Sequence, residues 1–140
     1  NAVVMCYRKQ AFGVDAAEAG YDVVMAPCRF CYLDYSQGLT NDTLMYFSGP
    51  LTLKQVYSFD PCAGVADGAR HHVLGGEGEN WTEFTWTPEE LDWKVWPRAC
   101  ALAECLWTAP SNRDYAEFLR RLEPQRVRLL AAGVNAAPCR

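Results

Sequence analysis

Strand and helix signals alternate at the start of this chain, and this order restricts the possible folds more than any other feature. Residues 2–6 form an apolar run typical of a buried strand. Residues 14–19 favour a helix that ends at Gly20, and a second apolar run at 21–26 stops at Pro27. A strand, a helix and a second strand in this order indicate a parallel crossover, so the sequence predicts an α/β fold.

The alternation resumes after a long stretch rich in chain breakers. Glycines and prolines between residue 28 and about residue 70 predict mostly loop, and so long a loop is usually functional or disordered. A third strand is predicted at residues 72–74. Pro97 suits the first position of a helix. The residues expected on the packing face of that helix are Ala99, Cys100, Ala103, Leu106 and Trp107.

A last helix and a strand count complete the expected architecture. The apolar stripe of the last helix contains Tyr115, Phe118, Leu119 and Leu122. We expect Pro124 to kink or divide this helix and Gly133 to end it. Three parallel strands make only part of a closed barrel, which needs about eight strands and typically ~250 residues. The chain is therefore predicted to be a piece of a barrel that is unstable or associates when alone.

Charge and hydropathy exclude several classes of protein. The net charge is −4, the pI is near 5.1, and the thirteen basic residues are scattered, which argues against a nucleic-acid surface. No apolar run approaches the ~20 residues of a membrane span, and no signal peptide is visible. Because the chain starts at Asn1 with a strand following at once, we interpret the N-terminus as truncated or processed, and the missing signal says little about location.

The seven cysteines have irregular spacing and do not predict a disulfide framework. Cys28 and Cys31 form a C-x-x-C motif, which elsewhere marks a redox pair or half of a zinc site. No second C-x-x-C exists to complete a zinc site, so no metal is expected. Buried or half-buried thiols are the favoured interpretation, and a redox module built on Cys28 and Cys31 stays open as an alternative.

The third strand leads into a segment with the chemistry of a sugar subsite. The apolar run breaks at Gly75 and Gly76, and Trp81 and Glu83 follow two residues apart. An indole face packs on the C–H groups of a pyranose, and a carboxylate accepts hydrogen bonds from hydroxyls. In an α/β barrel the reactive residues lie at the C-terminal ends of the strands. This segment is therefore a candidate ligand site.

Five blocks in one order resemble the β-N-acetylhexosaminidases of glycoside hydrolase family 20. They are YDVVMAP at 21–27, CYLDY at 31–35, VYSFDP at 56–61, LGG at 74–76 with NWTE at 80–83, and WPRA at 96–99 leading to AECLW at 103–107. The resemblance covers nearly the whole chain. It implies that residues 1–140 are the C-terminal portion, about three strand–helix units, of a TIM (β/α)8 catalytic barrel, with the remainder of that barrel as partner.

The resemblance also implies an activity. Members of this family are retaining exo-glycosidases that remove terminal N-acetylhexosamine from oligosaccharides or glycoconjugates without a cofactor. The acetamido oxygen of the substrate is the nucleophile, an exception to the usual pair of enzyme carboxylates. An Asp–Glu pair on an earlier strand orients the acetamido group and supplies the general acid, and this chain is expected to begin downstream of it. Secreted, periplasmic or lysosomal location is typical, and a non-catalytic sugar-binding relative is the alternative.

The family motifs assign roles to five residues. By resemblance, Tyr32 donates a hydrogen bond to the acetamido oxygen, Asp34 accepts one from a sugar hydroxyl, Trp81 forms a wall of the acetamido pocket, and Glu83 binds ring hydroxyls. Tyr7 stands where the family commonly has a tryptophan, so that wall of the pocket is altered. Without the family, each would be a core aromatic or a solvated loop carboxylate. The remaining tryptophans are expected to be structural: Trp86, Trp93, Trp96 and Trp107.

Overall fold

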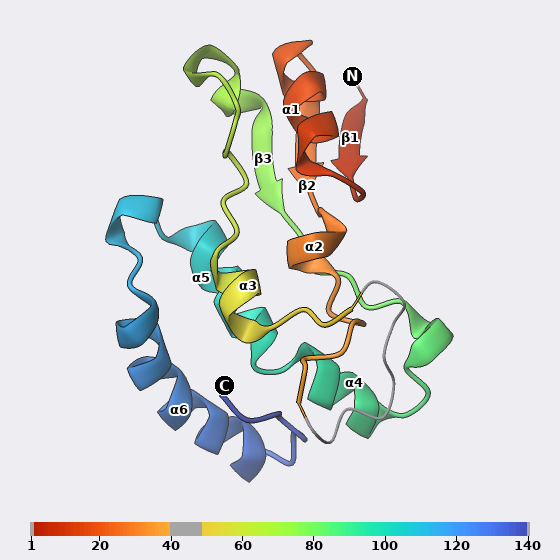
Figure 1. Cartoon of the computed structure of the whole chain (residues 1–140), viewed down its shortest axis with the longest axis vertical. Coiled ribbons are helices and arrows are strands. Elements are labelled where there is room, and N and C mark those ends of the chain that lie inside the picture. Colours follow the sequence, from red (N-terminus) through yellow and green to blue (C-terminus); the bar gives the residue numbers. More distant parts are fainter. Residues whose placement is uncertain (1, 40–48, 140) are drawn as a thin grey trace.

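A computed structural model describes residues 2–39 and 49–139. In chain order its elements are β1 Val3–Cys6, α1 Gln10–Glu18, β2 Asp22–Met25, α2 Cys28–Cys31, α3 Leu53–Tyr57, a 3-10 helix Asp67–His72, β3 Val73–Gly76, a 3-10 turn Thr82–Phe84, α4 Pro88–Val95, α5 Arg98–Trp107, a 3-10 turn Pro110–Asn112 and α6 Tyr115–Ala131. The strands and α1 lie at one end of the molecule, and α3 to α6 lie at the other (Figure 1).

The sheet contains three parallel strands in the order β1-β2-β3. Val3 pairs with Asp22 at one end of the β1–β2 ladder, and Cys6 pairs with Met25 at the other. The register between β2 and β3 shifts between Val23 and Val24. The predicted parallel crossover is therefore confirmed, with α1 as its helix. That helix begins at Gln10, earlier than expected, and Gly20 follows its end with φ of 86°.

Backbone pairing between the second and third strand regions continues past the strand ends. Tyr32 forms an isolated parallel bridge with Glu79. The Leu33 amide donates to the Glu79 carbonyl at 2.6 Å, and the Glu79 amide donates to the Cys31 carbonyl at 2.8 Å. β3 lies so close to β2 that a Cβ on Gly76 would lie 2.7 Å from the Met25 carbonyl oxygen. Glycine is needed there because the backbones touch.

The hydrophobic core continues from the sheet into the helices, where α3 packs on α5 and both lie against α6. On α5 the buried residues are Arg98, Ala101, Leu102 and Cys105. The predicted packing face of this helix is confirmed in part: Ala99, Cys100 and Leu106 pack against the core, but Ala103 is exposed and Trp107 is 90% exposed. A helix with apolar residues all round has no unique amphipathic stripe, so the neighbouring elements decide which side is buried.

The last helix agrees with its predicted stripe but not with its predicted break. Phe118 and Leu122 are buried, and Gly133 follows the helix end with φ of 85°. Pro124 lies inside α6, which continues to Ala131 as one helix (Figure 1). A proline removes one backbone donor and crowds one turn. Packing of the turns before Pro124 sets the direction of the helix, and the exposed turns after it continue that direction.

Short helices interrupt the stretch between residue 28 and about residue 70 that was predicted to be mostly loop. α2, α3 and the 3-10 helix Asp67–His72 lie there, so the loop prediction was wrong for these residues, and residues 40–48 lie outside the described part. The third strand begins at Val73, one residue late. α4 was not predicted, although its start carries a recognisable signal: Thr87 Oγ1 accepts from the Glu90 amide at 3.2 Å, and Pro88 is the first helical residue.

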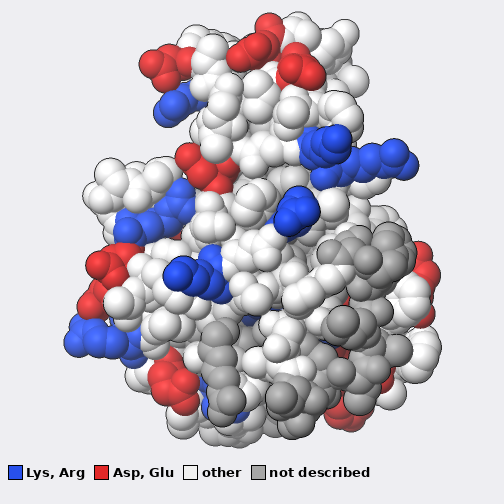
Figure 2. All heavy atoms as spheres, in the orientation of Figure 1, with Lys and Arg blue, Asp and Glu red and all other residues white. Residues whose placement is uncertain are grey.

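Surface charge and helix length add two observations. On the face drawn in Figure 2, Lys and Arg alternate with Asp and Glu and do not gather in one patch. Within residues 2–39 and 49–139, the helices lack the combination of length and hydropathy that a bilayer crossing requires.

Candidate functional site

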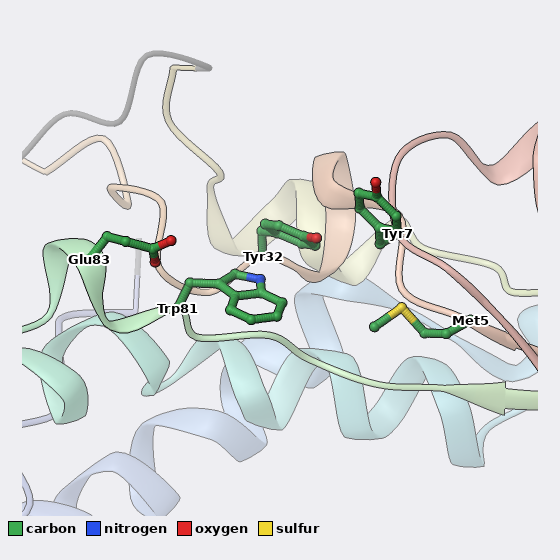
Figure 3. A pocket seen from close by; sticks show the side chains of 5 residues that line it. All are labelled: Met5, Tyr7, Tyr32, Trp81 and Glu83. Atoms are coloured by element: carbon green, nitrogen blue, oxygen red, sulfur yellow. The ribbon is translucent and has the colours of Figure 1, made fainter.

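A cavity of about 460 Å³ lies at the C-terminal ends of the three strands. Its lining residues are Met5, Tyr7, Tyr32, Trp81 and Glu83. Figure 3 shows Tyr32 and Trp81 in the centre, Glu83 at one end, and Tyr7 and Met5 at the other. Four of the five residues singled out in the sequence thus share one cavity, although they come from three separate segments.

Three strand ends bring these side chains together. Tyr7 directly follows β1, Tyr32 follows β2 and α2, and Trp81 follows β3. The Tyr32–Glu79 bridge sets the spacing between the second and third segments. Because β1, β2 and β3 are parallel and adjacent, their C-terminal ends meet at one edge of the sheet. The site is a direct consequence of the parallel topology.

Tyr32 is held as a neutral phenol. Burial raises its pKa to about 12, while a hydrogen bond from the Trp81 side chain acts in the opposite direction and the charge of Glu79 raises the pKa further. An indole N–H can only donate, so Trp81 does not compete for the phenolic proton, which Tyr32 can donate to a ligand. Tyr32 therefore suits a hydrogen-bond donor toward a ligand at neutral pH.

The side of the cavity formed by β1 is exposed to solvent. The Tyr7 ring is about half exposed, and its hydroxyl accepts from Arg8 Nε at 3.2 Å. Met5 also lines the cavity, and the sequence interpretation missed it. Residues two apart on a strand share a face, so the strand position of Met5 relative to Tyr7 could have indicated it.

Asp34 does not line this cavity. It is only 3% exposed, and among the described residues its Oδ1 atom has no hydrogen-bond partner. Burial raises the pKa of its carboxyl group, the nearby charges of Lys94 and Arg98 act in the opposite direction, and the charge of Glu83 raises the pKa further. A buried carboxylate oxygen with spare acceptor capacity suits a polar ligand group, because an unpaired buried acceptor is costly.

Glu79 and Asn80 are further polar residues that the sequence interpretation missed. Glu79 Oε1 and both side-chain polar atoms of Asn80 are buried without a hydrogen-bond partner among the residues the structure describes. Burial raises the pKa of Glu79 to about 7, and a hydrogen bond and negative charge from Glu77 contribute in the same direction. The acid-rich run before Trp81 was the available signal. These groups add buried polar atoms to the third segment, which follows β3.

The segment that carries Glu83 is fixed from behind by main-chain contacts. The Trp86 indole donates to the Glu83 carbonyl at 3.2 Å. Lys94 Nζ donates to the Phe84 carbonyl and, at 3.1 Å, to Thr85 Oγ1. Lys94 is buried, so these bonds replace the water that its ammonium group would otherwise bind. The Glu83 carboxylate is thereby presented on an anchored backbone.

A family model described as "Glycosyl hydrolase family 20, catalytic domain" matches residues 1–110. The chain belongs to glycosyl hydrolase family 20. It is 36% identical over 137 residues to a β-hexosaminidase of Porphyromonas gingivalis, covering 96% of this chain and 18% of that protein. It is 34% identical over 109 residues to a β-N-acetylhexosaminidase of Cellulomonas fimi, covering 78% of this chain and 22% of that protein. The chain thus spans about a fifth of these relatives.

Solved structures of family 20 enzymes share the fold. A Vibrio harveyi exo-β-N-acetylglucosaminidase in complex with N-acetylglucosamine superposes with a TM-score of 0.86 at 29% identity, covering 98% of this chain and 22% of that one. A Streptomyces plicatus N-acetyl-β-hexosaminidase superposes with a TM-score of 0.84 at 26% identity, covering 97% and 29%. These relatives are TIM-barrel enzymes, and the three-stranded parallel sheet of this chain is consistent with part of such a barrel.

Two other sequence interpretations can be compared with the geometry of this family 20 chain. Cys31 is fully buried and burial raises its pKa, whereas a redox cysteine needs a lowered pKa and access. Cys28 and Cys31 are both free thiols, and the described residues hold no group of three or more potential metal ligands. Trp93 and Trp96 are half-buried as expected, but Trp86 and Trp107 are exposed, so packing does not explain them here.

Proposed function

We propose that the enzyme containing this chain is a retaining exo-glycosidase that removes terminal N-acetylglucosamine or N-acetylgalactosamine from the non-reducing end of glycans. The observation that carries the proposal is the cavity in which Tyr7, Tyr32, Trp81 and Glu83 meet. It combines aromatic faces with one carboxylate and one neutral hydroxyl donor, as a pyranose with an N-acetyl group requires. Membership of family 20 and the relatives that bind N-acetylglucosamine support the same substrate class.

Each residue of the cavity has a role in this proposal. Trp81 forms an apolar wall for the acetamido group and the sugar face, with Tyr7 opposite it, and Glu83 accepts hydrogen bonds from ring hydroxyls. Asp34, which lies outside the cavity lining, accepts from a further hydroxyl in this proposal through its Oδ1 atom, which has no hydrogen-bond partner among the described residues. In the substrate-assisted route the acetamido oxygen bonds to the anomeric carbon as the glycosidic C–O bond breaks and the leaving oxygen takes a proton from the general acid. Water then attacks the anomeric carbon of the oxazolinium intermediate and restores the acetamido group.

Tyr32 contributes to that step through its proton. Its phenol donates to the acetamido oxygen and orients it for attack, and the raised pKa of about 12 keeps the donor intact across the working pH range. The general acid and the carboxylate that orients the acetamido nitrogen are, in this proposal, an Asp–Glu pair on another strand of the barrel. Residues 1–140 then form the C-terminal part of one catalytic domain.

The test is hydrolysis of a chromogenic N-acetyl-β-glucosaminide by the complete enzyme, with the anomer released followed by NMR. Release of the β-anomer first is expected, because two inversions at the anomeric carbon give retention. Release of the α-anomer first would contradict the route. Binding of N-acetylglucosamine without any turnover would instead favour the non-catalytic sugar-binding relative. The 140-residue chain alone is expected to be inactive, and robust turnover by it would contradict the division of roles.

A further inference from the structure

Arg98 lies fully buried at the start of α5, and its guanidinium binds main-chain carbonyls of the segment that follows Tyr32. Nη2 donates to the Leu33 carbonyl at 2.7 Å and to the Tyr35 carbonyl at 2.8 Å. These two carbonyls flank Asp34 on either side. One side chain from a distant helix therefore fixes the backbone on both sides of the candidate sugar-binding carboxylate.

The same guanidinium also binds the carbonyls of Ser36 and Leu51. Nη1 donates to the Leu51 carbonyl at 2.8 Å and to the Ser36 carbonyl at 3.4 Å. The Leu51 amide in turn donates to the Ser36 carbonyl at 2.9 Å. Arg98 is itself held, because its Nε donates to the Lys94 carbonyl at 3.0 Å. These contacts form one connected network between the start of α5 and residues 33, 35, 36 and 51.

The chemistry of arginine suits this arrangement. Guanidinium carries five N–H donors in a rigid plane and no acceptor, so it can bind several carbonyls that converge from one side. A buried cation is costly unless its donors are satisfied, and here carbonyl oxygens satisfy them. Lysine keeps the charge but offers fewer donors without the fixed plane, so it cannot hold the same set of carbonyls.

Together these contacts carry a specific role. We infer that Arg98 is a positioning residue for sugar binding: it holds residues 33–36 so that the Asp34 carboxylate stays directed at a ligand hydroxyl. This inference rests on the proposed function, because it requires that Asp34 binds the sugar. Arg98 itself does not line the cavity, so it acts only through the segment that it binds.

The test compares Arg98→Lys with Arg126→Met in the complete enzyme. Arg126 also donates to a backbone carbonyl, that of Ala137 at 2.7 Å, but lies on α6 and does not line the cavity. We expect Arg98→Lys to raise KM for an aryl N-acetylglucosaminide roughly tenfold, with a smaller fall in kcat, because a small displacement of a binding group weakens substrate binding. Arg126→Met should change thermal stability and leave KM unchanged.

A double-mutant cycle with Asp34→Asn separates positioning from general stability. If Arg98 acts through Asp34, then Arg98→Lys should raise KM much less in the Asp34→Asn background than in the parent enzyme. Equal effects in both backgrounds, or an unchanged KM for Arg98→Lys, would overturn the inference.

Folding and the proposed function are controlled separately. If neither Arg98→Lys nor Arg98→Gln folds while Arg126→Met does, Arg98 belongs to folding and the positioning role is overturned. Failure of the parent enzyme to bind N-acetylglucosamine by calorimetry would overturn the proposed function and this inference together. Binding by the parent with an unchanged KM in the variants would overturn the inference alone.

Discussion

The segments that follow β2 and β3 differ in how firmly the chain holds them. Residues 33–36 after Tyr32 are buried, and Arg98 binds their carbonyls from below. Residues 81–83 after β3 are exposed, with Trp81 46% exposed; Trp86 holds the Glu83 carbonyl, and Lys94 holds Phe84 and Thr85. Lys94 and Arg98 come from neighbouring turns of α4 and α5. The end of α4 and the start of α5 thus hold both segments of the site, and they hold the segment after β2 more firmly.

The segment after Tyr32 is therefore the more preorganised of the two. A group that must act in a transition state gains from a fixed position, whereas a group that only binds hydroxyls tolerates more freedom. We therefore expect Tyr32, at the start of the firmly held segment, to act mainly on kcat, and the hydroxyl-binding carboxylates Asp34 and Glu83 to act mainly on KM. Substitutions on both segments test this division.

Tyr32→Phe should give the largest effect in the complete enzyme. Loss of one preorganised donor is expected to lower kcat about 100-fold with little change in KM. Steady-state kinetics on an aryl N-acetylglucosaminide measure both constants. Tyr57→Phe is the matched control, because it removes a hydroxyl that binds Glu104 at 3.0 Å in the helical layer. Equal weakening of a substrate and of an oxazoline-like inhibitor would contradict a transition-state role.

Glu83→Gln should act mainly on binding. Replacing the carboxylate weakens charge-assisted bonds to hydroxyls, so KM is expected to rise roughly tenfold with a smaller fall in kcat. Glu89→Gln serves as the control, since Glu89 is an exposed glutamate at the start of α4. A loss confined to kcat would contradict the proposed role of Glu83 in substrate binding.

Glu79→Gln tests how protonation of Glu79, where the two segments pair, changes the pH dependence of stability. The pKa of Glu79 is raised from its ordinary 4.5 to about 7, by burial first and then by Glu77, so the folded state takes up a proton more readily than the unfolded state. The stability from this group is present below pH 4.5 and is lost as pH rises through about 7. In the parent, calorimetry should show a smaller contribution of Glu79 to the free energy of unfolding at pH 8 than at pH 5.

The variant should remove that contribution. Its melting temperature at pH 8 is expected to exceed that of the parent by about 2 °C, while the difference at pH 5 should be smaller. A parent and variant with parallel melting temperatures between pH 5 and pH 8 would show that Glu79 does not titrate in this window. The exposed Glu89→Gln variant again supplies the baseline.

Cys28→Ser should give the smallest effect. Cys28 is half-buried at the start of α2, and its Sγ donates to the Arg8 carbonyl at 3.3 Å, a contact that a serine hydroxyl can keep. Activity should be unchanged and insensitive to added oxidant. Thiol titration of the folded protein should leave the buried Cys31 unreactive. An oxidant-dependent change in the parent that Cys28→Ser abolishes would revive the redox interpretation.

Local patterns were enough to predict the sheet. The apolar runs at 2–6 and 21–26 and the helix between them predicted parallel strands, because each signal is confined to a few adjacent residues. The glycine-broken strand end pointed to Trp81 and Glu83, whereas Tyr7 and Tyr32 were named from the family resemblance. The structure brings these four residues to one cavity, together with Met5.

The helical layer was less predictable for a physical reason. The packing face of α5 was predicted only in part, because its buried side also depends on α3, which comes from a distant part of the chain. α2 and α3 are too short to carry a periodic signal. Arginine is usually found at the surface. Arg98 can be buried because the carbonyls of residues 33, 35, 36 and 51 accept its hydrogen bonds.

Short motifs in the sequence were enough to indicate the family, the parallel order of the strands and four of the side chains that line the cavity. The burial of Asp34 outside the cavity lining, and the support of the two segments by Arg98 and Lys94, follow only from the folded structure. Burial and backbone hydrogen bonding depend on which distant segments meet, and no local pattern encodes that.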